Sequence, residues 1–146
     1  MPPELRIQDI THVIQLSVAP VFLLTAVGTI LNVLVNRLAR VVDRARRLGE
    51  RLEEMTERAR PPIEAELRVL ARRRRFVNYA ITLGTTAALL VCLVIAVAFL
   101  GFILHADFSG ALAGLFIAAM LAFIGALVFF LREIFLAVAT PGMGVR

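Results

Sequence analysis

The chain has 146 residues, 60% of them hydrophobic, and its mean hydropathy of +0.85 is far above that of an ordinary soluble domain. These values exclude a water-soluble globular protein and indicate a membrane protein. The formal net charge is +5 and every basic residue is an arginine. These arginines adjoin apolar stretches, where anionic phospholipid is the nearest counter-charge, so we expect no nucleic-acid partner.

The N-terminal segment, residues 1–19, has the pattern of an amphipathic helix, with apolar residues from Ile7 to Val18 on one face. Its start lacks the positive region and the cleavage site of a secretory signal, so we expect no processing. Pro20 follows the segment. It either kinks a continuous helix or separates an interfacial helix from the first membrane span.

Three stretches are long and apolar enough to cross a bilayer, which takes about 20 residues. We predict transmembrane helices at residues 20–37, 76–104 and 111–131, with a tight connection at 105–110. The single cysteine, Cys92, lies within the second span and has no partner for a disulfide. We interpret it as a small buried hydrophobic residue.

Arginine counting sets the predicted orientation. Thirteen of the sixteen arginines fall between Arg37 and Arg75, and the 105–110 connection has none. Because basic loops stay on the cytoplasmic side, we place residues 38–75 and the tail at 132–146 in the cytoplasm and the N-terminus outside.

Residues 38–75 carry a heptad rhythm that predicts an antiparallel, coiled-coil-like helical hairpin. Its apolar positions alternate at steps of three and four: Leu38, Val41, Ala45, Leu48, Leu52, Met55 and Ala59. Pro61 and Pro62 interrupt this rhythm and are suited to open the returning helix. The predicted fold class is therefore all-α, with three transmembrane helices and a cytoplasmic hairpin between the first and second.

The two arms of this hairpin differ in length. A returning helix from a tip near Arg60 reaches Arg75 after about 22 Å, at 1.5 Å per residue. The same length measured back along the first helix reaches only Ala45. Straight helices would therefore hold Asn36, Arg37 and Arg40 at or inside the inner membrane interface, where they need polar partners.

A polar seam follows one face of the first long helix and continues into the hairpin. Its members are spaced at three or four residues: Thr25, Thr29, Asn32, Asn36, Arg40 and Asp43. One interpretation is that the seam bonds within the subunit to Asn78, Thr82 and Thr85 or Thr86 of the second span. The other is that several subunits turn it toward a shared axis and line a hydrated pore.

Small residues recur every four positions along the third span, at Gly110, Gly114, Ala118, Ala122 and Ala126. Such a ridge lets another helix approach closely, either within the subunit or between subunits. A run of four arginines, Arg72, Arg73, Arg74 and Arg75, stands directly before the second span. It marks the cytoplasmic flank and is suited to contact anionic lipid headgroups.

Catalytic motifs are lacking from the sequence. Asp9, His12, His105 and Asp107 all fall on the predicted outer side. They are either solvated or gathered into a cation or proton site, and their spacing matches no metal motif. With no nucleophile–base set and no phosphate-binding loop, we expect no enzyme, no cofactor and no metal.

One pattern resembles a known family. The run from Asn36 to Arg46 has the form N-R-x-x-R-x-x-D-R-x-R, follows a span containing Pro20 and precedes an arginine-rich returning helix. It is similar to bacterial membrane proteins grouped as domain of unknown function 2721, over nearly the whole chain. The resemblance implies a small three-span inner-membrane protein and brings no activity with it.

The leading functional hypothesis is a homo-oligomeric ion channel or transport assembly in which the first span lines the pore. The alternative is a non-conducting scaffold or accessory subunit that binds anionic lipid or partner helices through its arginine-rich hairpin. The sequence leaves open the ion, the subunit number, the gating stimulus and the physiological partner.

Overall fold

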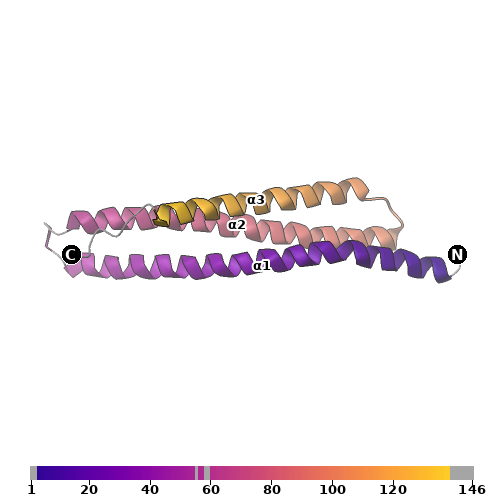
Figure 1. Ribbon diagram of the computed structural model, residues 1–146, viewed down its shortest axis with the longest axis horizontal. Helices are drawn as coiled ribbons and strands as arrows, with labels where there is room; N and C mark the ends of the chain where they lie inside the picture. The colour runs from indigo at the N-terminus through magenta and orange to yellow at the C-terminus, as the bar shows by residue number, and fades with distance from the viewer. Residues whose placement is uncertain (1–2, 55, 58–59, 139–146) are drawn as a thin grey trace. The chain divides into compact units, whose positions relative to one another are not determined.

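The computed structural model describes residues 3–54, 56–57 and 60–138, the side chains of residues 3–10, 12–13 and 16–17 aside. It contains three long helices, α1 (Pro3–Glu54), α2 (Arg60–Leu104) and α3 (Ser109–Val138) (Figure 1). The chain is all-α over these residues. Helix α1 is continuous through Pro20, so this proline does not separate an N-terminal helix from the first span. Helix α3 continues beyond Leu131, where the predicted third span ends.

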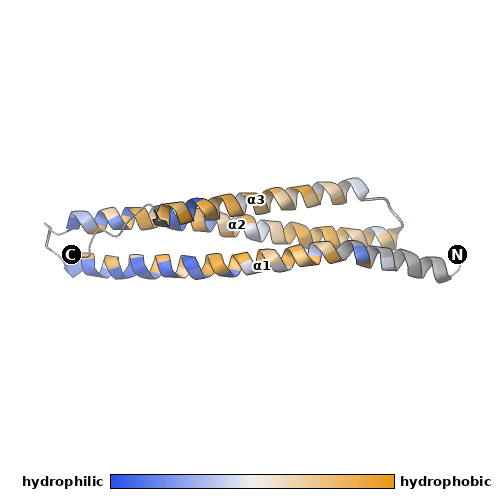
Figure 2. Cartoon of the chain, in the orientation of Figure 1, coloured by the Kyte–Doolittle hydropathy of each residue, from blue (hydrophilic) through white to orange (hydrophobic). Residues whose placement is uncertain are grey.

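All three helices are long and apolar enough to cross a membrane: the qualifying segments are Val18–Glu54, Arg60–Leu104 and Ser109–Ala137. Hydrophilic residues concentrate in the C-terminal part of α1 and the N-terminal part of α2, whereas the rest of α2 and most of α3 are hydrophobic (Figure 2). Large apolar side chains also cover the outer faces, including Phe22, Leu121 and Phe135. An exterior of this kind is suited to lipid, as expected of a multi-pass membrane protein.

The connection from α2 to α3 is closed by hydrogen bonds of its own. His105 follows the last residue of α2 with a φ of 52°, and the Ala106 amide donates to the Gly101 carbonyl oxygen at 3.1 Å. A left-handed residue with such a bond is a common way to end a helix. A side chain at position 101 would lie 3.1 Å from the Phe108 ring, so glycine allows the close return of the chain.

Asp107 lies just before α3 and binds the first residue of that helix. Its Oδ1 accepts a hydrogen bond from the Ser109 amide at 2.9 Å, one of the N–H groups that have no acceptor within the helix. This bond lowers the pKa of the exposed Asp107 carboxyl below its ordinary value. The carboxylate is thus bound more favourably than the protonated acid.

The chain divides into two compact units. Unit 1 comprises Met1–Leu31 and Leu83–Ile124, and unit 2 comprises Asn32–Thr82 and Gly125–Arg146. In unit 1 the buried side chains come from all three helices: Val27 from α1, Ala87, Val91 and Val94 from α2, and Ala119 from α3. Most are small, which allows close approach of helices where lipid gives no hydrophobic driving force.

Unit 2 buries a second set of side chains from the same three helices: Leu34 and Val41 from α1, Leu70, Val77 and Ala80 from α2, and Ala126 and Glu133 from α3. Within each helix these residues are seven or three positions apart. This is the heptad spacing of helices that face their neighbours along one seam. On α3 this spacing leads from Ala126 directly to Glu133. A charged residue therefore occupies a core position.

We expect Ala80→Leu to destabilise the protein by about 1–3 kcal/mol, because Ala80 is fully buried and a larger side chain overpacks the helix contacts. The measurement is the free energy of unfolding of the full chain in mixed micelles. Ala65→Leu makes the same change at an exposed position of α2 and should stay within about 0.5 kcal/mol of the natural chain. Equal effects of the two changes would contradict this packing.

We expect Asp107→Asn to accelerate amide exchange at Ser109, because the amide loses its bond to a carboxylate. Folding lowers the pKa of Asp107, so the ionised carboxylate stabilises the folded chain. This stabilisation is fully present above the ordinary pKa of 3.8. It is lost as the pH falls from that value through the lower pKa of the folded state. The difference in Ser109 amide exchange between the natural chain and Asp107→Asn should therefore vanish in that acid range. A difference that persists there would show that the carboxylate charge is not its source.

Candidate functional site

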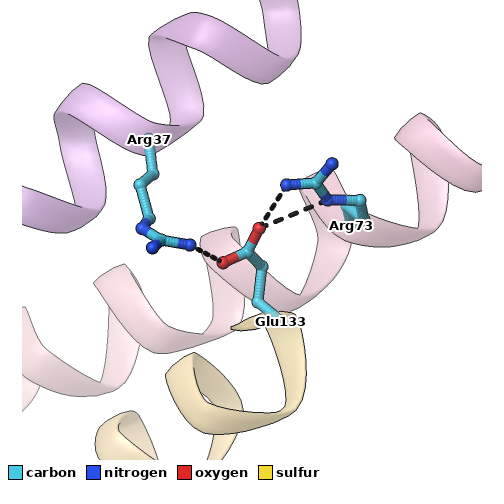
Figure 3. A network of polar contacts seen from close by, with 3 residues as sticks. All are labelled: Arg37, Arg73 and Glu133. Carbon is cyan, nitrogen blue, oxygen red and sulfur yellow. Dashed lines mark hydrogen bonds and ion pairs between the residues drawn. The ribbon is translucent and has the colours of Figure 1, made fainter. Parts of the chain in front are cut away.

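Glu133 of α3 lies between two arginines from the other two helices (Figure 3). Its Oε2 accepts a hydrogen bond from Arg37 Nη1 of α1 at 2.7 Å. Its Oε1 accepts from Arg73 of α2, at 2.8 Å from Nη2 and 3.2 Å from Nε. The glutamate side chain is 0% exposed, and those of Arg37 and Arg73 are 30% and 24% exposed. We call these three residues the Glu133 triad; all belong to unit 2.

One aromatic ring contacts the Glu133 triad, and an aromatic cluster lies nearby in the sequence of α2 and α3. The Arg37 guanidinium lies over the Phe130 ring, 5.4 Å from its centroid, which adds a cation–π contact to the ion pair. On the side of α2, Phe129 packs against Phe76 and Tyr79, with centroid distances of 6.2 and 5.5 Å. Phe129 and Phe130 precede Glu133 by about one helical turn. Because the Glu133 side chain has no exposed surface, its interaction with the arginines is stronger than it would be in water.

Burial of an ion pair has a large cost. Removing a carboxylate from water costs several kcal/mol even after the protein relaxes, and only well-placed partners offset it. Here both carboxylate oxygens accept hydrogen bonds, and none of the described buried side-chain N or O atoms is left without a partner. The net gain in stability is therefore modest, but any arrangement that separates Glu133 from its arginines is strongly disfavoured. The Glu133 triad specifies one alignment of three helices.

The polar seam of α1 lies on the exterior of the chain. All six of its residues are exposed: Thr25, Thr29, Asn32, Asn36, Arg40 and Asp43. The threonine hydroxyls donate to carbonyl oxygens one turn earlier, Thr25 to Val21 at 3.2 Å and Thr29 to Thr25 at 3.0 Å. Asn36 Nδ2 donates to Asn32 Oδ1 at 3.3 Å. These bonds all lie within α1.

The candidate partners on α2, Asn78, Thr82 and Thr86, are exposed as well. The Thr82 hydroxyl donates to the Asn78 carbonyl oxygen at 3.0 Å, which is again a bond within one helix. The interaction of these residues with the seam of α1 stays a prediction.

The four consecutive arginines of α2 do not share one environment. Arg73 points to Glu133, whereas Arg72, Arg74 and Arg75 are exposed. Farther along α1, Arg44 binds Glu66 of α2, with Nε and Oε1 2.8 Å apart, and Arg46 binds Glu50 on its own helix at 3.2 Å. Within the described residues, Arg72, Arg74 and Arg75 have no carboxylate partner. Of the four consecutive arginines, these three are therefore available to an external anion.

On the small-residue ridge of α3, Gly110, Gly114 and Ala118 are exposed and Ala122 is half-buried. A side chain at Gly110 or Gly114 would meet nothing within 4 Å. Within the described part of the chain, no helix packs against Gly110 or Gly114, where the ridge was predicted to allow close packing.

Of the four polar residues predicted to lie on the outer side, His105 and Asp107 are in the α2–α3 connection, and the side chains of Asp9 and His12 lie outside the described residues. Across the described residues, no group of three or more His, Cys, Asp or Glu is placed to hold a metal ion.

Sequence reasoning required a partner for Arg37 but did not identify Glu133. The glutamate is 96 residues from Arg37 and 60 from Arg73, and it lies beyond the end of the predicted third span. Two signals pointed to it. Glu133 is the only acidic residue between Gly110 and Val138, and it follows Ala126 by one heptad. An acid at a core position beside an apolar span needs a basic partner.

The model of the family described as "Protein of unknown function (DUF2721)" matches residues 17–142. No curated protein and no solved structure matches the chain.

We expect Glu133→Gln to destabilise the protein by about 3 kcal/mol, the lower end of the range for removing one partner of a buried ion pair. The two arginines then lose their shared anion while their side chains remain only 30% and 24% exposed. The measurement is the free energy of unfolding in mixed micelles. Glu64→Gln removes the same charge at an exposed site of α2 and should change stability by less than about 0.5 kcal/mol.

Replacing the whole Glu133 triad provides the complementary test. Because a buried ion pair is close to neutral against apolar groups of similar volume, the triple variant Arg37→Met, Arg73→Met, Glu133→Leu should recover most of the stability that Glu133→Gln loses. A triple variant no more stable than Glu133→Gln would mean that the triad stabilises the fold outright. Equal stability of Glu133→Gln and Glu64→Gln would mean that the burial has no energetic consequence.

Proposed function

We propose that this chain, which belongs to the DUF2721 family, forms a homo-oligomeric ion-conducting or transport assembly in which α1 lines the conduit. One observation carries the proposal. The six polar residues of the α1 seam, Thr25 to Asp43, are all exposed on a stretch of helix whose other exposed residues are apolar. A polar face of this length beside apolar spans requires water or protein against it.

Within this seam, Asn32 and Asn36 are the residues that most strongly require water or protein, and not lipid, against the α1 face. The threonine hydroxyls are satisfied by their own backbone, so Thr25 and Thr29 tolerate lipid. Each asparagine amide has two donor hydrogens and two acceptor lone pairs, and the single bond between Asn36 and Asn32 uses only a fraction of them. Exposure of the remainder to hydrocarbon is costly. The two amides therefore favour a hydrated path or an interface between subunits.

A homo-oligomer follows from the number of spans. Three helices from one chain pack against one another and leave no lumen between them, so a conduit needs the α1 faces of several copies. The exposed glycines of α3, Gly110 and Gly114, offer a second surface on which a neighbouring copy can approach closely. In this assembly α1 faces the axis and α3 contacts the adjacent subunit.

The orientation we propose rests on the arginines. With thirteen of sixteen between Arg37 and Arg75, this region is cytoplasmic, the N-terminus lies outside, and the C-terminus is cytoplasmic in a bacterial inner membrane. The ion pair between Arg44 of α1 and Glu66 of α2 supports an antiparallel arrangement of the two helices there. The Glu133 triad then lies near the cytoplasmic ends of the spans.

The alternative function is a non-conducting scaffold or accessory subunit that binds anionic lipid. The observation that favours it is the pair of exposed arginines, Arg74 and Arg75, directly before the apolar part of α2. The two functions differ in what the α1 seam contacts. A scaffold would cover it with protein, whereas a conduit would leave it hydrated.

We expect the double variant Asn32→Leu, Asn36→Leu to reduce ion flux through liposomes containing the purified protein by about tenfold or more, since a hydrophobic stretch in a narrow pore blocks ions by dewetting. Asn78→Leu makes the same chemical change on α2 and should preserve flux. Native mass spectrometry should give the same oligomer for all three chains. Absence of flux from the natural chain, or equal loss from Asn78→Leu, would overturn the proposal.

A further inference from the structure

A groove of about 700 Å³ lies between α1 and α2 in unit 2. Its apolar lining comes from both helices: Val41, Val42 and Ala45 of α1, and Leu67, Leu70 and Ala71 of α2. We call it the arginine groove, because its polar lining consists of Arg46, Arg74, Arg75 and Asn78. This volume falls in the range of pockets that take small molecules.

The arginine groove is positively charged and contains no acid in its lining. Arg46 is paired with Glu50 at 3.2 Å, but both side chains are well exposed, and such a pair is weak. Arg74 and Arg75 have no carboxylate partner within the described residues. Their neighbour Arg73 is excluded from the groove because it binds Glu133. The groove therefore selects an anion, and two unpaired guanidinium groups suit a phosphate.

The position and the apolar floor of the groove narrow the choice of anion. Arg74 and Arg75 are the last of the consecutive arginines of α2, and the apolar sequence begins at Phe76. Figure 2 shows this change from a hydrophilic to a hydrophobic part of α2. The exposed Val42 and Ala71 line the groove on one side of these arginines, and the apolar part of α2 follows on the other side. A phospholipid brings a phosphate together with hydrocarbon, and the adjoining membrane supplies it.

We propose that the arginine groove binds the headgroup of one anionic phospholipid per chain, with the phosphate held by Arg74 and Arg75, the rest of the headgroup over Val42 and Ala71, and the acyl chains directed toward the apolar part of α2. This site goes beyond the proposed conduction, since it uses a different surface from the α1 seam. It also divides the four consecutive arginines: Arg74 and Arg75 hold the lipid, Arg73 holds Glu133, and Arg72 takes no part.

The test measures binding of dioleoyl phosphatidylglycerol to the full chain in neutral-detergent micelles by native mass spectrometry, with dioleoyl phosphatidylcholine for comparison. We expect one phosphatidylglycerol per chain and weaker binding of phosphatidylcholine. Arg74→Gln and Arg75→Gln should each weaken binding about tenfold, the scale of one lost hydrogen bond to a charged group. Arg72→Gln removes an equal charge from an exposed neighbour that does not line the groove and should change binding less than about twofold.

A second variant tests the apolar floor with every charge retained. Ala71→Phe fills the groove at an exposed position and should weaken lipid binding about as much as Arg75→Gln, with an unchanged helical signal in circular dichroism. Equal weakening by Arg72→Gln would overturn the proposal in favour of diffuse attraction to the lipid surface. Unchanged binding to Ala71→Phe, or displacement of the lipid by inorganic phosphate at matched ionic strength, would also overturn it. None of these readouts depends on ion flux, so the conduction proposal stands or fails separately.

Discussion

Glu133 has no exposed surface, and the guanidinium groups of Arg37 and Arg73 are what offsets the cost of its buried charge. Each of the three helices supplies one member of this contact. Because successive residues of a helix differ by about 100° in direction, a small rotation of any one helix would withdraw its side chain. The Glu133 triad is thus a single constraint on the rotation and axial position of α1, α2 and α3 in unit 2, and the complete burial of Glu133 makes the constraint severe.

The same constraint determines which face of α1 remains outside. When Arg37 points inward to Glu133, Asn36, the residue before it, is turned by about 100° and becomes exposed. Asn32, Arg40 and Asp43 follow on that side at helical spacing. The exposed polar face that supports the proposed conduit is therefore a geometric consequence of the buried ion pair. On α2 the same reasoning applies, since Arg73 points inward while Arg74 and Arg75 turn toward the groove.

The sequence was sufficient to predict three long apolar helices, because the apolar runs are continuous and their ends are marked by arginines and by the 105–110 connection. It also showed that Arg37 would need a partner, through the unequal arms around Arg60. Glu133 could not be paired with Arg37 and Arg73 because no local pattern encodes a contact across 96 residues. The α1 seam was visible as a periodic pattern, but its exposure depends on how the helix is rotated, which only the packing determines. Continuity of α1 through Pro20 was also left open, because proline both bends helices and is tolerated in apolar ones.

The most direct test of this account is a solid-state NMR measurement of dipolar coupling between Glu133 Cδ and arginine guanidinium nitrogens, in the full chain within phospholipid bilayers. The account predicts couplings to two guanidinium groups, one lost in Arg37→Met and the other in Arg73→Met, at separations set by hydrogen bonds of 2.7–2.8 Å. A Glu133 carboxyl coupled to neither arginine, or one exposed to bulk water, would contradict the buried triad and the orientation of α1 that depends on it.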